Sequence, residues 1–149
     1  MPKINVALLG SGLFVTGAYI PALAANTSDV NLHTLWSRSR SSVEKALTKV
    51  TEAGLKAASL YGEEGLDKVF NDKSIDAVML VLPITTQPAL VIRALKAGKH
   101  VLSEKPLAKD VKDARELVET YEREYKSKGL IWRVAESEPI GSSNASCKD

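Results

Sequence analysis

Short apolar runs alternate with longer amphipathic stretches along this chain. Continuous apolar runs are typical of strands that are buried on both faces, and apolar residues three and four positions apart are typical of helices. We expect strands at residues 4–9, 32–36, 55–61, 77–82, 100–103 and 130–135. We expect helices from about residue 19, at 41–50, 65–70 and 86–97, and from residue 110 to about residue 125. The alternation predicts an α/β fold, Rossmann-like and doubly wound, with a mostly parallel six-stranded sheet.

Two residue patterns indicate where the first two helices begin. Pro21 suits the first turn of a helix, so the first helix is expected to begin at Tyr19 or Ile20, after an irregular glycine-rich turn. Ser41 and Glu44 have the spacing of a capping box, which predicts the start of the second helix.

The composition is that of one ordinary folded domain. Of the 149 residues, 44% are hydrophobic and 26% are charged, and a chain of this length has room for a single core. We expect that domain to span residues 1–136. From residue 137 the sequence is rich in Ser, Asn and Gly and has no periodicity, so residues 137–149 are expected to form an irregular tail.

Charge and cysteine content argue against several kinds of site. The chain has 20 Lys and Arg residues against 18 Asp and Glu residues, and these are interspersed, whereas a nucleic-acid surface needs clustered cations. Its single cysteine, Cys147, excludes a disulfide framework and a multi-cysteine metal site. No secretory signal or membrane-spanning run precedes the first strand. We therefore expect a cytoplasmic protein with no nucleic-acid partner, no membrane partner and no metal site.

The first strand ends at two glycines, Gly10 and Gly12. They match the first two glycines of the G-x-G-x-x-G dinucleotide fingerprint, with Val15 at the third position. Gly10 allows a tight turn, and Gly12 lets the backbone approach a pyrophosphate. Val15 indicates a wider turn and looser packing of the first helix. The motif favours a dinucleotide site, and a tight turn without a ligand is the alternative.

The residues after the second strand bear on which dinucleotide is bound. An acid at this place accepts hydrogen bonds from ribose hydroxyls, whereas an arginine accommodates a 2′-phosphate. The sequence here is Ser37, Arg38, Ser39, Arg40, with no acid before Glu44. This favours NADP(H) over NAD(H), because Arg38 can pair with a phosphate and the serines can donate to it. Solvated polar residues that cap the next helix are the alternative.

The fifth strand is followed by an acid, a lysine and a proline, Glu104, Lys105 and Pro106. The lysine is placed at the carboxyl edge of the sheet, where open parallel sheets bind ligands. There it could orient a nicotinamide amide or a substrate hydroxyl and support proton transfer. A surface Glu and Lys beside a proline that ends the strand is the alternative.

These three motifs, together with the stretch ALKAGKHVLSEKPLA at residues 94–108, resemble the nucleotide-binding half of the Gfo/Idh/MocA oxidoreductases. This is the family of glucose-fructose oxidoreductase and inositol dehydrogenase. The likeness covers residues 3–136, and the first turn is most similar to that of fungal members. The resemblance implies that Lys105 positions the nicotinamide and the substrate. It also implies cofactor contacts from Gly10, Gly12, Leu13 and Phe14 at the phosphates, Ser37 and Arg38 at the adenosine phosphate, Leu82, Pro83, Glu104 and Lys105 along the cofactor, and Gln87 near the nicotinamide.

The resemblance also implies a second domain, which in this family forms the substrate pocket and carries an acid–base histidine. We expect that domain to be absent here, since the pattern is lost after Glu136, and His33 and His100 fall in predicted strands, where we expect them to be structural. The expected function is binding of NADP(H), with NAD(H) as second choice, and little or no turnover by the chain alone. A non-catalytic regulatory or interaction module is the alternative, and a truncated or misread gene is a third reading. A second copy or a partner chain is expected to cover the exposed sheet edge.

Overall fold

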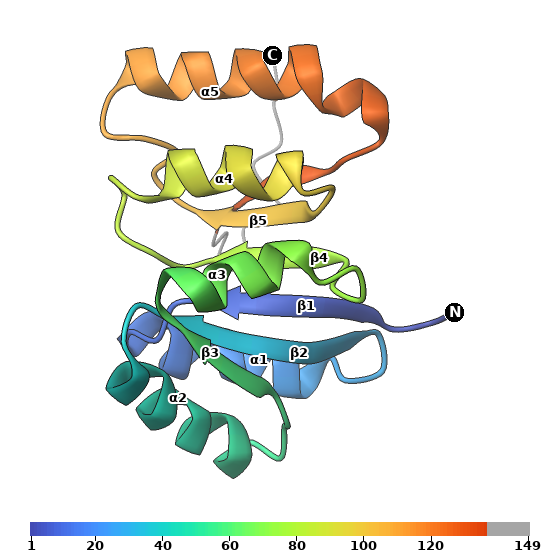
Figure 1. Ribbon diagram of the computed structural model, residues 1–149, viewed down its shortest axis with the longest axis vertical. Helices are drawn as coiled ribbons and strands as arrows, with labels where there is room; N and C mark the ends of the chain where they lie inside the picture. Colours follow the sequence, from blue (N-terminus) through green and yellow to red (C-terminus); the bar gives the residue numbers. More distant parts are fainter. Residues whose placement is uncertain (137–149) are drawn as a thin grey trace, which may run out of the picture.

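One parallel sheet organises the computed structural model, which describes residues 1–136 (Figure 1). Its six strands are β1 (Ile4–Leu9), β2 (Val30–Ser37), β3 (Ala58–Tyr61), β4 (Ala77–Leu80), β5 (His100–Glu104) and β6 (Trp132–Ala135). They are ordered β3-β2-β1-β4-β5-β6, and every neighbouring pair is parallel. The predicted Rossmann-like sheet is therefore confirmed, and its order reverses between β1 and β4. The predicted tail at residues 137–149, with Cys147, lies outside the described residues.

Helices cover both faces of the sheet. They are a π-helical turn (Val15–Tyr19), α1 (Ile20–Ala25), α2 (Arg40–Glu52), α3 (Gly62–Asn71), α4 (Gln87–Lys96), α5 (Val111–Glu124) and a 3₁₀ turn (Lys126–Lys128). The π-helical turn, α1 and α2 pack on one buried cluster, and α3, α4 and α5 pack on the other. Figure 1 shows the strands stacked from β3 at the bottom to β5 near the top, with α5 outermost beyond α4.

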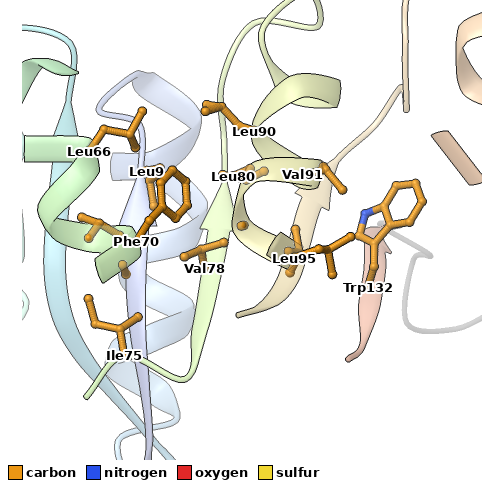
Figure 2. Packing of buried hydrophobic residues seen from close by; sticks show 14 of the residues in the cluster. Leu9, Leu66, Phe70, Ile75, Val78, Leu80, Leu90, Val91, Leu95 and Trp132 are labelled. Carbon is orange, nitrogen blue, oxygen red and sulfur yellow. The ribbon is translucent and has the colours of Figure 1, made fainter. Parts of the chain in front are cut away.

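Alternating residues of β4 supply both faces of the core. Val78 and Leu80 are fully buried on the face of α3 and α4, whereas Met79 packs with the cluster of α1 and α2. Figure 2 shows Val78 and Leu80 lying between Phe70 of α3 and Leu95 of α4. A strand buried on both faces reads as an uninterrupted apolar run, which is why this strand could be recognised in the sequence.

Several element ends differ from the predicted ones. β3 begins at Ala58 rather than residue 55, β4 ends at Leu80 rather than residue 82, and α3 begins at Gly62 rather than residue 65. Apolar residues continue past the paired part of a strand, because loops that cross a core also bury side chains. The pattern therefore predicted which elements exist better than it predicted where they end.

The predicted start of the first α-helix, at Tyr19 or Ile20, agrees with the start of α1 at Ile20, but the irregular turn predicted before it is wrong. Helical backbone already begins at Leu13, and Pro21 lies in the first turn of the α-helical part only. The Ile20 N–H donates to the Val15 carbonyl, five residues back, which is a π-helical bond. The loose packing expected at Val15 is also wrong, because that side chain is fully buried.

The predicted capping box at Ser41 and Glu44 is wrong as well. The N-cap of α2 is Ser39, whose Oγ accepts a hydrogen bond from the Ser42 N–H at 3.3 Å. Glu44 pairs instead with Arg40, one turn back, at 2.7 Å. Ser39 and Ser41 could both be the cap from the sequence, and the extended backbone of Ser39 together with its hydrogen bond from Ser42 marks Ser39 as the cap.

Gly10 lies at the point where β1 leaves the sheet and the first helix begins. Its φ is +135°, and a Cβ at this position would overlap the carbonyl oxygen of Val81 and lie 3.3 Å from Cγ2 of Val15. By contrast, a Cβ on Gly12 would meet no atom within 4 Å, and its φ is not positive. Gly10 is therefore required by the fold, whereas Gly12 leaves open space beside the turn.

Gly10→Ala is expected to lower the free energy of unfolding by about 3 kcal/mol or more, because strain at positive φ adds to the overlap with Val81. Gly12→Ala is the matched control and is expected to change it by less than about 1 kcal/mol. Urea unfolding followed by circular dichroism measures both. Equal destabilisation of the two variants would contradict the close approach at Gly10.

Candidate functional site

A groove opens at the carboxyl ends of β1, β2 and β4, beside the point where the strand order reverses. Open parallel sheets bind ligands at this place. The groove has a volume of about 500 Å³. We call it the serine groove, and it is lined by Gly10, Ser11, Gly12, Ser37, Arg38, Ser39, Ser42, Val81, Leu82 and Pro83. Four hydroxyl groups and one guanidinium give it the donors that a phosphate or a sugar needs.

Ser37 joins the end of β2 to the glycine turn. Its side chain is buried, and its Oγ lies 2.7 Å from Oγ of Ser11, which stands between the two glycines. The Gly10 N–H also donates to the Trp36 carbonyl, at 2.9 Å. The two walls of the serine groove are therefore held together by hydrogen bonds before any ligand arrives.

The two neighbouring arginines have different surroundings. Arg40 is bound to Glu44 through its Nε at 2.7 Å, although both side chains are mostly exposed. Arg38 is exposed, and among residues 1–136 it makes neither an ion pair nor a side-chain hydrogen bond. Arg38 is thus the guanidinium that an anion in the serine groove can reach without breaking an existing pair.

Two helix N-termini add partial positive charge to the same edge. α2 begins at Arg40, directly after the groove residue Ser39, and the helix after β1 begins at Leu13, directly after Gly12. The first N–H groups of a helix have no carbonyl one turn back to bind, so they can donate to a ligand. In this arrangement an anionic ligand would meet donors from both sides of the serine groove.

A second, smaller pocket lies beside the first helix and the ends of β5 and β6. We call it the tyrosine pocket, and it has a volume of about 260 Å³. Its lining residues are Phe14, Ala18, Tyr19, Ala22, Leu102, Glu104, Lys105, Ala135 and Glu136. Most of them are apolar, so the few polar groups would fix the orientation of a planar ligand there.

Gln87 holds the main chain of Glu104 in place. Gln87 is buried at the start of α4, and its Oε1 accepts from the Glu104 N–H at 3.0 Å while its Nε2 donates to the Glu104 carbonyl at 3.3 Å. A buried amide that binds both main-chain groups of one residue fixes the position of that residue. The carboxylate of Glu104 and the neighbouring Lys105 therefore project from a rigid strand end.

Tyr19 holds the side chain of Glu104. The Tyr19 hydroxyl donates to Oε1 of Glu104, and the ring packs edge-on against Phe14 with ring centres 5.7 Å apart. Burial, and then the hydrogen bond to Glu104 and the charge of that carboxylate, raise the pKa of Tyr19 far above its usual value. The hydroxyl therefore stays protonated and keeps its donor role at any ordinary pH.

The predicted site residues fall into three places. Those of the serine groove are Gly10, Gly12, Ser37, Arg38, Leu82 and Pro83, and those of the tyrosine pocket are Phe14, Glu104 and Lys105. Leu13 lines neither, since its side chain projects into solvent and is 91% exposed, and Gln87 is buried behind Glu104. Contacts of these residues with a cofactor stay predictions.

Tyr19, Ser11 and Ser42 were missed by the sequence analysis. Ser11 and Ser42 were missed because the motifs around them assign ligand contacts to the glycines and to Arg38 rather than to these serines. Tyr19 was missed because it was taken for the start of a helix, and nothing in the pattern shows that a π-helical turn directs it to Glu104.

Both histidines lie away from this edge. His100, at the amino end of β5, accepts a hydrogen bond at Nδ1 from the Ile131 N–H at 3.0 Å. Nε2 of His33 lies 3.1 Å from Oγ of Ser74.

Within residues 1–136 there is no group of three or more His, Cys, Asp or Glu side chains that could hold a metal ion. None of the helices in this part of the chain has both the length and the hydropathy that a membrane span needs.

Comparison with known proteins matches the chain to one family. Residues 4–129 match the Gfo/Idh/MocA family model, described as the oxidoreductase family, NAD-binding Rossmann fold. The chain is 35% identical over 140 residues to dehydrogenase FPY6 of Fusarium mangiferae, covering 90% of this chain and 38% of that protein. It is 31% identical over 134 residues to an uncharacterized oxidoreductase of Schizosaccharomyces pombe, covering 90% of this chain and 34% of that one.

Solved structures give the same result. An oxidoreductase from Thermotoga maritima superposes with a TM-score of 0.78 at 26% identity, over 90% of this chain and 38% of its own. The 3-ketoreductase KijD10 from Actinomadura kijaniata, in complex with NADP and TDP-benzene, superposes with a TM-score of 0.73 at 26% identity, over 89% of this chain and 37% of its own. The chain thus spans little more than a third of the length of these relatives. It belongs to the Gfo/Idh/MocA oxidoreductase family through its NAD-binding Rossmann fold.

Proposed function

We propose that this chain binds NADP(H) in preference to NAD(H), as the cofactor-binding part of an oxidoreductase. The observation that carries the preference is Arg38, an exposed guanidinium at the end of β2 with no ion-pair partner among the described residues. No acid follows β2 before Glu44, and Glu44 is paired with Arg40. A 2′-phosphate would therefore meet a cation at this place and no competing carboxylate.

The shape of the serine groove suits a dinucleotide. The open space beside Gly12 lets a pyrophosphate lie against the backbone, where the first N–H groups of the helix from Leu13 can donate to it. Ser42 stands beside Arg38 and can donate its hydroxyl to a 2′-phosphate, while the Ser39 hydroxyl donates to Oγ of Ser42 at 2.8 Å. The similar 3-ketoreductase KijD10 was solved in complex with NADP, which supports the same choice here.

The tyrosine pocket would receive the nicotinamide end. The bound cofactor would supply the hydride chemistry. Lys105 would orient the nicotinamide carboxamide or a substrate oxygen, and its ammonium would hold a proton that the substrate oxygen can take up. Glu104 and Gln87 would keep Lys105 at the strand end. Since both histidines lie elsewhere, we expect the chain by itself to bind cofactor with little or no turnover.

Arg38→Ala is expected to weaken NADPH binding about 10- to 100-fold, because charge-assisted hydrogen bonds to the 2′-phosphate are lost. Binding of NADH, which lacks that phosphate, is expected to change by less than about twofold, since its affinity does not depend on the missing contact. Isothermal titration of each protein with both cofactors measures the four affinities.

Arg40→Ala is the matched control for Arg38, since it removes the same charge two residues away. Because Arg40 is already bound to Glu44, NADPH affinity should stay close to the wild-type value. A folded wild-type protein that binds neither cofactor would overturn the proposed function. Equal losses for both cofactors in Arg38→Ala would overturn the assignment of Arg38 to the 2′-phosphate.

Gly12→Ala is expected to abolish measurable NADPH binding while the protein keeps its thermal stability, because the added methyl group occupies the space into which the pyrophosphate would fit. Differential scanning fluorimetry with and without NADPH measures both properties at once. The wild type should melt at a higher temperature with the cofactor, and the variant should not. A full cofactor-induced shift in the variant would show that the pyrophosphate binds elsewhere.

A further inference from the structure

We propose that Tyr19 is a positioning residue of the tyrosine pocket, which keeps the Glu104 carboxylate away from the Lys105 ammonium so that Lys105 stays free to bind its ligand. This inference rests on the proposed function of the pocket, since it concerns the lysine that would meet the nicotinamide or the substrate. Tyr19 is not expected to touch the reacting atoms. Its effect would pass through Glu104 alone.

The Glu104 carboxylate is held from two sides. Oε1 accepts from the Tyr19 hydroxyl, and Oε2 lies 3.3 Å from the main-chain N–H of Lys105, which donates to it. The main chain beneath is fixed by both bonds to Gln87. A glutamate side chain has several rotatable bonds, and two hydrogen bonds on different oxygens leave it one orientation.

Lys105 follows Glu104 directly, and both residues line the tyrosine pocket, where a carboxylate and an ammonium could pair. Within the described residues, however, Glu104 and Lys105 form no ion pair, although eight other ion pairs form among those residues. The difference is that Glu104 already has a partner in Tyr19. A lysine occupied by its own neighbour would have to lose that pair before it could bind a ligand.

Tyr19 is the last residue of the π-helical turn. Val15, the first residue of that turn, is fully buried, and Tyr19 packs against the same buried cluster while its hydroxyl reaches Glu104 at the end of β5. π-helical turns frequently occur at functional sites.

Tyr19→Phe removes the hydroxyl and keeps the ring that packs on Phe14, so the test concerns the hydrogen bond. The measurement is the rate at which an N-hydroxysuccinimide ester acylates Lys105 in the cofactor-free protein, read by peptide mass spectrometry with the other lysines as internal references. Only the neutral amine reacts, and a new pair with the released carboxylate favours the charged form. We expect the Lys105 rate to fall about two- to fivefold.

Two further variants make the result specific. Tyr121→Phe removes a comparable hydrogen bond, from its hydroxyl to the Leu130 carbonyl at 2.9 Å, away from Lys105, and should leave the rate unchanged. In a Glu104→Gln background there is no carboxylate to release, so adding Tyr19→Phe should have no further effect. Circular dichroism of each variant verifies that it is folded.

An unchanged Lys105 rate in Tyr19→Phe would overturn the proposal, and so would an equal fall in the Glu104→Gln background. Because the labelling uses no cofactor, its outcome is separate from cofactor binding. A labelling effect together with a wild type that binds neither NADPH nor NADH would overturn the proposed function and leave the role of Tyr19 toward Lys105 in place. Cofactor binding without a labelling effect would do the reverse.

Discussion

The close approach of Gly10 to the carbonyl of Val81 is the constraint on which both halves of the site depend. β1 lies between β2 and β4, and the chain leaves β1 at Gly10 while it is bonded to both neighbours: the Gly10 N–H donates to the Trp36 carbonyl, and the Val81 N–H donates to the Leu9 carbonyl, both at 2.9 Å. A side chain at Gly10 would force these strands apart. Because the strands stay together, the residues after β2 and those after β4 become the two walls of one groove.

The first helix connects the close approach at Gly10 to the tyrosine pocket. It begins directly after the glycines, and its π-helical turn buries Val15 against Gly10 while it carries Tyr19 to Glu104. The turn at the end of β1 and the lysine at the end of β5 are therefore connected through one short segment. π-helical turns of this kind frequently occur at functional sites.

Much of the fold could be predicted from the sequence, and less of the site. β1 and β4 were recognised because strands buried on both faces leave apolar runs such as Val78 to Leu80. Gly10 was recognised because its conformation excludes other residues. The irregular turn expected before the first helix was wrong because a π-helical turn has no sequence period of its own, and the cap of α2 was wrong because several serines near residue 40 can cap a helix. Tyr19 could not be found, because its partner lies 85 residues away.

The difference between Arg38 and Arg40 shows how a helix boundary assigns roles to similar residues. Ser39 caps α2, so Arg40 is the first helical residue and Glu44 stands one turn later on the same face, where the two side chains pair. Arg38 precedes the cap and so lies outside the helix, among the residues that line the serine groove. If Ser41 were the cap, as the spacing to Glu44 suggested, Arg40 would precede the helix too and both guanidiniums would compete for the same anion. The position of one N-cap therefore determines which of the two arginines pairs with Glu44.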